Sequence, residues 1–124
     1  MFQPRGAMAA MPAQDLERAK AFYEQKLGLT PVEETEQGTR YRVGENEFLL
    51  FPSTGKASGD HTQLGFDVDD LVGAVKTLRD RGVTFEEYDM PGFKSVDGIV
   101  EVEGEKSAWF KDSEGNLIVV VQPG

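Results

Sequence analysis

The chain has 124 residues, with 22 acidic and 13 basic side chains and a net charge of -9 at pH 7. This length fits a single domain, or two small repeats that share a core, and the acidic balance makes nucleic acid and anionic membranes poor partners because phosphates attract clustered Lys and Arg. The sequence has no cysteine, no run of about 20 apolar residues that could span a membrane and no signal-peptide pattern, so we exclude disulfides and Cys-ligated metals and expect a soluble cytoplasmic protein.

The first half of the chain predicts one strand, one helix and three further strands. Residues 7–13 form the expected first strand. Asp15 then caps a helix whose apolar residues recur at a spacing near 3.6, and Gly28 ends it. Three strands are expected after the helix, separated by turns that contain Gly, at residues 29–34, 38–43 and 47–51.

The second half repeats this order after a connector rich in Gly, Ser and Pro. Asp70-Leu71 corresponds to Asp15-Leu16, and Gly82 corresponds to Gly28, so the same helical pattern occurs twice. The expected elements are a strand at 61–68, a helix at 70–81, a strand at 83–88, a long loop, and strands at 106–111 and 116–122.

This repeat predicts an α+β fold within one domain, residues 1–124. Two βαβββ modules, at about 6–52 and 61–122 and joined by a linker at 53–60, should form a curved mixed sheet around a cleft. Each module alone can bury only one face of its sheet under its helix, which leaves the other face for a ligand.

Three segments, in this order, resemble the vicinal oxygen chelate superfamily, which includes glyoxalase I, the bleomycin-resistance proteins and the extradiol dioxygenases. They read DLERA…FY…LGL at residues 15–29, GFDVDDL at 65–71 and WFKDSEGNL at 109–117. The resemblance implies the same two-module fold. It also implies a divalent metal in the cleft, which enzymes of this family hold with His, Gln or Glu side chains from four strands.

In this sequence the four ligand positions of the family fall on Met8, on Leu49 or its neighbour Leu50, on Gln63 and on Val119. Only Gln63 carries a suitable donor, since a thioether is too soft for a hard divalent ion and aliphatic side chains have no donor at all. A stable site needs about three protein ligands. The resemblance therefore implies a member without metal or cofactor that binds a hydrophobic or aromatic small molecule, as the drug-sequestering resistance proteins do.

The ligand pocket is expected on the inward faces of the strands. We expect Tyr41 to face inward as an aromatic wall and Arg40 and Arg42 to face outward as solvated charges. Tyr88 and Phe93, on the long loop, could close over a planar ligand as a lid or pack on a partner subunit. The family commonly forms dimers, so a homodimer is expected. The predicted ligand-binding residues are Met8, Tyr41, Leu49, His61, Gln63, Tyr88, Phe93, Trp109 and Val119, with Gln63 as the polar anchor.

Two other functions stay open at this point. A metal-dependent lyase, isomerase or dioxygenase would need Glu47, Glu101 or Glu103 to join Gln63 and His61 around one ion. His61, the only histidine, is otherwise a solvated residue or a hydrogen-bonding group at the mouth of the cleft. An interaction module would instead fill the pocket with its own Met and Phe side chains.

Overall fold

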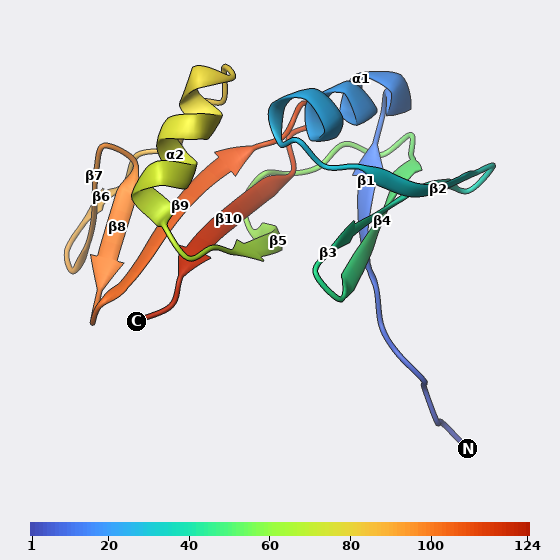
Figure 1. Cartoon of the computed structure of the whole chain (residues 1–124), viewed down its shortest axis with the longest axis horizontal. Helices are drawn as coiled ribbons and strands as arrows, with labels where there is room; N and C mark the ends of the chain where they lie inside the picture. Colours follow the sequence, from blue (N-terminus) through green and yellow to red (C-terminus); the bar gives the residue numbers. More distant parts are fainter.

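The computed structural model describes residues 1–124 and contains two units of the same connectivity, each with one helix over one sheet (Figure 1). The first unit consists of β1 (Ala9–Ala13), α1 (Leu16–Ala21) with its π-helical continuation η1 (Phe22–Lys26), β2 (Pro31–Thr35), β3 (Gly38–Val43) and β4 (Asn46–Pro52). The second unit consists of β5 (Thr62–Asp67), α2 (Leu71–Asp80), β6 (Asp89–Met90), β7 (Phe93–Val96), β8 (Ile99–Val102), β9 (Glu105–Lys111) and β10 (Leu117–Gln122). None of the helices has the length and apolar character that a membrane crossing requires.

The strand order shows that the two units share one topology. In the first sheet the order is β1-β4-β3-β2, and β1 lies parallel to β4. In the second sheet the order is β5-β10-β9-β8-β7-β6, and β5 lies parallel to β10. Each unit is therefore a βαβββ module whose first strand lies beside its last, and the second module carries the short strands β6 and β7 as an addition. The predicted α+β fold of two such modules is confirmed.

Both helices begin where the repeated Asp-Leu pairs predict. The carboxylate of Asp15 accepts a hydrogen bond from the backbone N–H of Arg18 (3.1 Å), and that of Asp70 accepts one from Gly73 (3.1 Å). Each bond satisfies one of the free N–H groups of the first helical turn. The first helix is followed by Gly28 at φ +74°, a conformation that favours glycine at the end of a helix.

The predicted strand at residues 83–88 is wrong. This segment makes only one isolated β-bridge, between Phe85 and Phe110, and the second strand of the second module, the first after its helix, is instead β8. Tight turns at Asp97-Gly98 and Glu103-Gly104 flank β8, and their residues have positive φ (53° and 82°, then 52° and 84°), as type I′ turns require. An acidic residue followed by Gly, between stretches of Val and Ile, was the sequence signal for these two hairpins.

A single hydrophobic core spans both modules on the side where α1 and α2 lie, above the strands in Figure 1. The rings of Phe22 in η1 and Phe110 in β9 lie 6.2 Å apart between centroids, and those of Phe48 in β4 and Phe66 in β5 are equally close at 6.2 Å. Because side chains alternate along a strand, every second residue of each sheet points away from this core. We call that side of each sheet its helix-free face.

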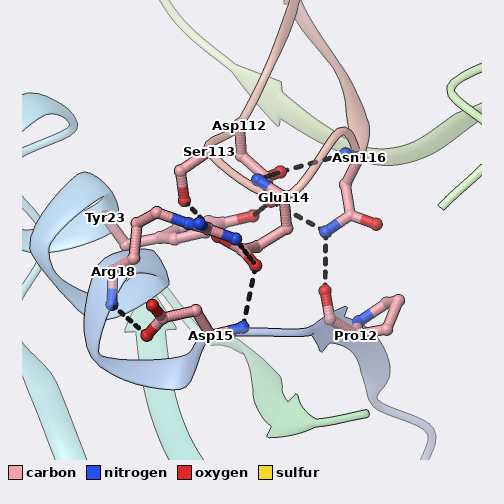
Figure 2. A network of polar contacts seen from close by, with 8 residues as sticks. All are labelled: Pro12, Asp15, Arg18, Tyr23, Asp112, Ser113, Glu114 and Asn116. Carbon is pink, nitrogen blue, oxygen red and sulfur yellow. Dashed lines mark hydrogen bonds and ion pairs between the residues drawn. The ribbon is translucent and has the colours of Figure 1, made fainter. Parts of the chain in front are cut away.

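A polar network joins the two modules, between the β1–α1 corner and the turn from β9 to β10 (Figure 2). The Glu114 carboxylate in that turn accepts hydrogen bonds from the Arg18 guanidinium (2.7 Å from Nε and 2.9 Å from Nη2) and from the backbone N–H of Asp15 (3.0 Å). We call the whole set the inter-module network, formed by Pro12, Asp15, Arg18, Tyr23, Asp112, Ser113, Glu114 and Asn116.

Asp112 is the centre of the buried part of this network. Its carboxylate accepts hydrogen bonds from the Tyr23 hydroxyl (2.6 Å), from the Asn116 side-chain Nδ2 (2.8 Å), and from the backbone N–H groups of Glu114 (2.8 Å) and Asn116 (2.9 Å). Asn116 also donates from Nδ2 to the carbonyl of Pro12 (2.9 Å), and so links the turn to β1. Burial and the neighbouring Asp112 charge raise the pKa of Tyr23, so this hydroxyl stays a donor at all ordinary pH values.

The ion pair of the network predicts a loss of stability in acid. The Arg18 guanidinium holds the pKa of Glu114 down to about 2, below the value of the unfolded chain, so the stabilisation is complete above about pH 4.3 and disappears as the pH falls toward 2. Glu114 is 1% exposed but Arg18 is 54% exposed, so solvent screening makes the contribution of this pair smaller than the pKa shift alone would give.

The measurement is the urea unfolding free energy of the wild type minus that of Glu114→Gln, at pH 7, 4 and 2. The difference should be largest at pH 7 and shrink toward pH 2, because the protonated Glu and the neutral Gln are then nearly equivalent. A difference that does not change between pH 7 and pH 2 would show that the charge on Glu114 contributes nothing.

Candidate functional site

A hollow of about 560 Å³ lies on the helix-free face of the second sheet. Trp109 of β9 and Val119 of β10 pair directly across the two strands and both line it, while their neighbours Phe110 and Ile118 are buried in the core. The residues that line the hollow are Thr62, Gly92, Phe93, Val100, Val102, Glu105, Ser107, Trp109, Val119 and Val121.

The rings of Phe93 and Trp109 line this hollow and the ring of Tyr88 packs on both, and we call these three residues the aromatic cluster. Their ring centroids are 5.4 Å apart for Tyr88 and Trp109, 5.5 Å for Phe93 and Trp109, and 5.5 Å for Tyr88 and Phe93. Such edge-on and tilted contacts are the favoured geometry for aromatic pairs. The indole N–H of Trp109 donates to the hydroxyl of Thr62 (3.1 Å), which fixes the ring against β5.

The segment that carries Tyr88 and Phe93 is held in place by polar contacts. The Glu87 carboxylate accepts hydrogen bonds from the Ser95 hydroxyl and from the backbone N–H of Gly98 (3.0 Å), and the first of these lowers the pKa of Glu87. The backbone N–H of Ser95 donates to the carbonyl of Tyr88 (2.8 Å). Burial, with the nearby Glu86 charge, raises the pKa of Tyr88, so the cluster presents a neutral phenol.

The structure brings four of the predicted ligand-binding residues together, namely Tyr88, Phe93, Trp109 and Val119. It also adds Thr62, which was not among the predicted residues and which strict alternation along β5 would place on the opposite face from Gln63. The reason is a bulge, because Thr62 pairs with Leu117 but Leu64 pairs with Ile118, which leaves Gln63 unpaired between them. The sequence offers no clear signal for this bulge.

Gln63 and His61 lie close to the hollow along β5 without lining it. Gln63 is half-buried at the bulge, and His61 is exposed just before the strand begins. Met8 and Leu49 belong to the other module. Leu49 is on the helix-free face of the first sheet, paired with Ala10 of β1, and Met8 precedes β1 with 45% of its surface exposed.

The expectation that Tyr41 faces the ligand is wrong. Its ring is fully buried in the core, with ring centroids 5.3 Å from Phe48 and 5.9 Å from Tyr23, and its hydroxyl donates to Glu24 (2.8 Å). The face of β3 that lies under the helix excludes water. Burying a large aromatic side chain there therefore gains more free energy than placing it on the opposite face. Burial raises the pKa of Tyr41.

The two arginines of β3 therefore lie on the helix-free face. Arg40 pairs across the strands with Leu49 and makes ion pairs with Glu33 (3.1 Å) and Glu47 (3.4 Å). Arg42 makes an ion pair with Glu47 (2.7 Å). These charges need water and carboxylate partners, which only this face provides. The helix-free faces of the two sheets thus differ in character, charged in the first module and mainly apolar in the second.

The residues present do not fit the metal that the fold family implies. At the four ligand positions the chain has a thioether, an aliphatic side chain, one amide and a second aliphatic side chain, from Met8, Leu49, Gln63 and Val119. No group of three His, Asp or Glu side chains in the structure is placed to hold an ion. Glu47, a candidate for a shifted ligand set, is occupied by its two arginine partners.

Two βαβββ modules with their helices on one side and a hollow on the other place the chain in a class of paired-module α+β proteins. Residues 7–120 match the family model of the Glyoxalase/Bleomycin resistance protein/Dioxygenase superfamily, and the chain belongs to this superfamily. The resemblance read from the sequence is thereby confirmed. None of the curated proteins compared with the chain matches it.

Solved structures show the same fold. UcmS2 superimposes with a TM-score of 0.74 at 20% identity, covering 97% of this chain and 98% of that one. A glyoxalase family protein from Enterococcus faecalis gives 0.71 at 20% identity, covering 98% and 100%. A lactoylglutathione lyase from Agrobacterium tumefaciens gives 0.67 at 23% identity, covering 97% and 95%. At these identities the comparisons establish the fold alone.

Proposed function

We propose that this chain is a small-molecule-binding member of its superfamily that uses no metal, similar in action to the proteins that sequester a drug unchanged. The observation that carries the proposal is the aromatic cluster beside Val119, at a position where the family's enzymes have a metal ligand. The occupant is a hydrophobic or aromatic molecule that packs on Trp109 and against Val119.

The chemistry of the hollow favours apolar contact over polar recognition. A flat ring that removes about 100 Å² of apolar surface from water gains about 2.5 kcal/mol, whereas one additional hydrogen bond contributes about 1 kcal/mol net. The hydroxyls of Thr62 and Ser107 in the lining can orient a ligand that has one or two polar atoms.

The homodimer remains a prediction, and the lining of the hollow supports it. All of its lining residues come from the second module, and Val102 at its margin is 46% exposed. A second copy could cover this open side and complete the wall.

Trp109 is the only tryptophan, so its fluorescence reports directly on the hollow. We expect a member of a panel of aromatic antibiotics to change this emission in a saturable way and, at 100 times its dissociation constant, to raise the unfolding free energy by about 2.7 kcal/mol.

The variant Val119→Arg places a charged side chain in the hollow and should weaken binding of that antibiotic at least tenfold, as measured by calorimetry. The matched control is Val72→Arg, at a position that is 56% exposed on α2 and should bind as the wild type does. Equal affinities of Val119→Arg and the wild type would refute the hollow as the binding site.

A further inference from the structure

A second cavity, of about 310 Å³, lies on the opposite side of the molecule, between the two modules and under α2. Its module-one wall comes from the segment after η1 and from β3, and its module-two wall comes from β5, α2, β9 and β10. The side chains that face each other across it are Leu27, Leu29 and Val43 from the first module and Phe66, Val68 and Leu78 from the second.

The lining of this inter-module cavity offers water molecules few hydrogen-bond partners. Of its 12 lining residues 9 are hydrophobic, and its charged residues, Asp67 and Arg81, are exposed. The buried polar side-chain atoms that lack a hydrogen-bond partner are Arg40 Nε and Asn116 Oδ1, and neither residue lines it. Because a water molecule needs two to four polar partners, water against these apolar walls is held poorly and an apolar guest replaces it at a gain.

The size and charge of the cavity limit which molecules it can bind. A water-sized group occupies about 30 Å³, so the space holds about ten such groups, the number of non-hydrogen atoms in one or two fused rings. The net charge of -9 disfavours an anion, and the two charged lining residues, Asp67 and Arg81, have opposite signs and add no net charge at the cavity. We propose that the inter-module cavity is a second binding site, separate from the hollow, for a compact, uncharged aromatic or alicyclic molecule.

The two sites lie on opposite faces of the same strands. Phe110 and Val120 line the inter-module cavity, and their neighbours in sequence, Trp109 and Val119, line the hollow on the other face. A guest in the cavity contacts both modules at once and therefore stabilises their packing against each other.

The test is a titration of the full-length protein with indole, an uncharged probe of this size, followed by methyl NMR. We expect saturable chemical-shift changes that are largest at the methyl groups of Leu27, Leu29 and Leu78. Changes that are largest at Val119 and Val121 would place indole in the hollow and overturn the second site, and the absence of any saturable change would overturn it as well.

A pair of variants with the same substitution tests the location independently. Ala74→Leu, on the cavity side of α2, fills part of the space and should weaken indole binding at least tenfold. The matched control, Ala21→Leu at an exposed position of α1, should leave it unchanged.

A dispersed NMR spectrum verifies that Ala74→Leu is folded. If Ala74→Leu does not fold, Thr77→Leu, at a second lining position, replaces it as the filling variant. Binding by the folded filling variant that equals the wild type would overturn the proposal. Because Val119→Arg alters only the hollow, the failure of one site is distinguishable from the failure of the other.

Discussion

Replacing Asp112 by Ala should lower the free energy of unfolding by about 4 kcal/mol, because each buried donor left without a partner costs about 1–3 kcal/mol. The carboxylate is 6% exposed and accepts hydrogen bonds from Tyr23, from Glu114 and from both the side chain and the backbone of Asn116. We assume that water entering the vacated space satisfies some of these donors. Such a loss is a large fraction of the about 5–15 kcal/mol by which domains are stable.

Urea unfolding followed by circular dichroism measures this loss. Asp60→Ala is the matched control, since Asp60 is an exposed residue of the connector and its removal should change stability by less than about 0.5 kcal/mol. A loss below about 1 kcal/mol for Asp112→Ala would mean that the network contributes little beyond the turn itself.

Gly38→Ala should cost at least about 3 kcal/mol, because the added methyl group meets rigid backbone. An ideal Cβ at Gly38 would lie 2.2 Å from the carbonyl oxygen of Leu50 and 3.0 Å from the Cα of Phe51 on the adjacent strand β4, and the residue has φ +139°. Relief would require β3 and β4 to separate at the start of their pairing.

Gly44→Ala is the control that separates overlap from backbone strain. Gly44 has φ +59° in the next turn, and a Cβ there would meet nothing within 4 Å, so its replacement should cost only the about 1–2 kcal/mol of a left-handed Ala. Thermal or urea unfolding of the two variants gives the comparison. Equal losses would show that the close approach at Gly38 is relieved at no cost.

The elements that local chemistry determines were predictable from the sequence. The two Asp caps, the glycine after the first helix and the strands of the first module follow from short-range patterns, and the structure has all of them. Strand β8 was missed although Asp97-Gly98 and Glu103-Gly104 are turn signals, because residues 83–88 alternate well enough to suggest a strand. They make only the single bridge from Phe85 to Phe110, because β8 pairs with the other end of the same β9 edge, at residues 105–107.

The candidate site was harder to predict because it depends on which face of a strand the helix covers. Alternation along β3 places Tyr41 on one face of the strand and Arg40 and Arg42 on the other, but it does not indicate which face is buried. The buried face is the one that the helix covers. The single-residue bulge at Gln63 also shifts the register of β5, so that Thr62 lies beside Trp109. The inter-module network joins residues about 90–100 positions apart, such as Arg18 and Glu114, and no local pattern indicates such a pairing.

The central claim is that the hollow beside Trp109 binds its ligand without a metal. The most direct measurement is the affinity of an antibiotic that quenches Trp109 fluorescence, determined before and after exhaustive treatment with a chelator. We expect the same dissociation constant in both preparations, and no change on adding Zn²⁺, Ni²⁺ or Mn²⁺. Binding that vanishes with the chelator and returns with one of these ions would contradict it.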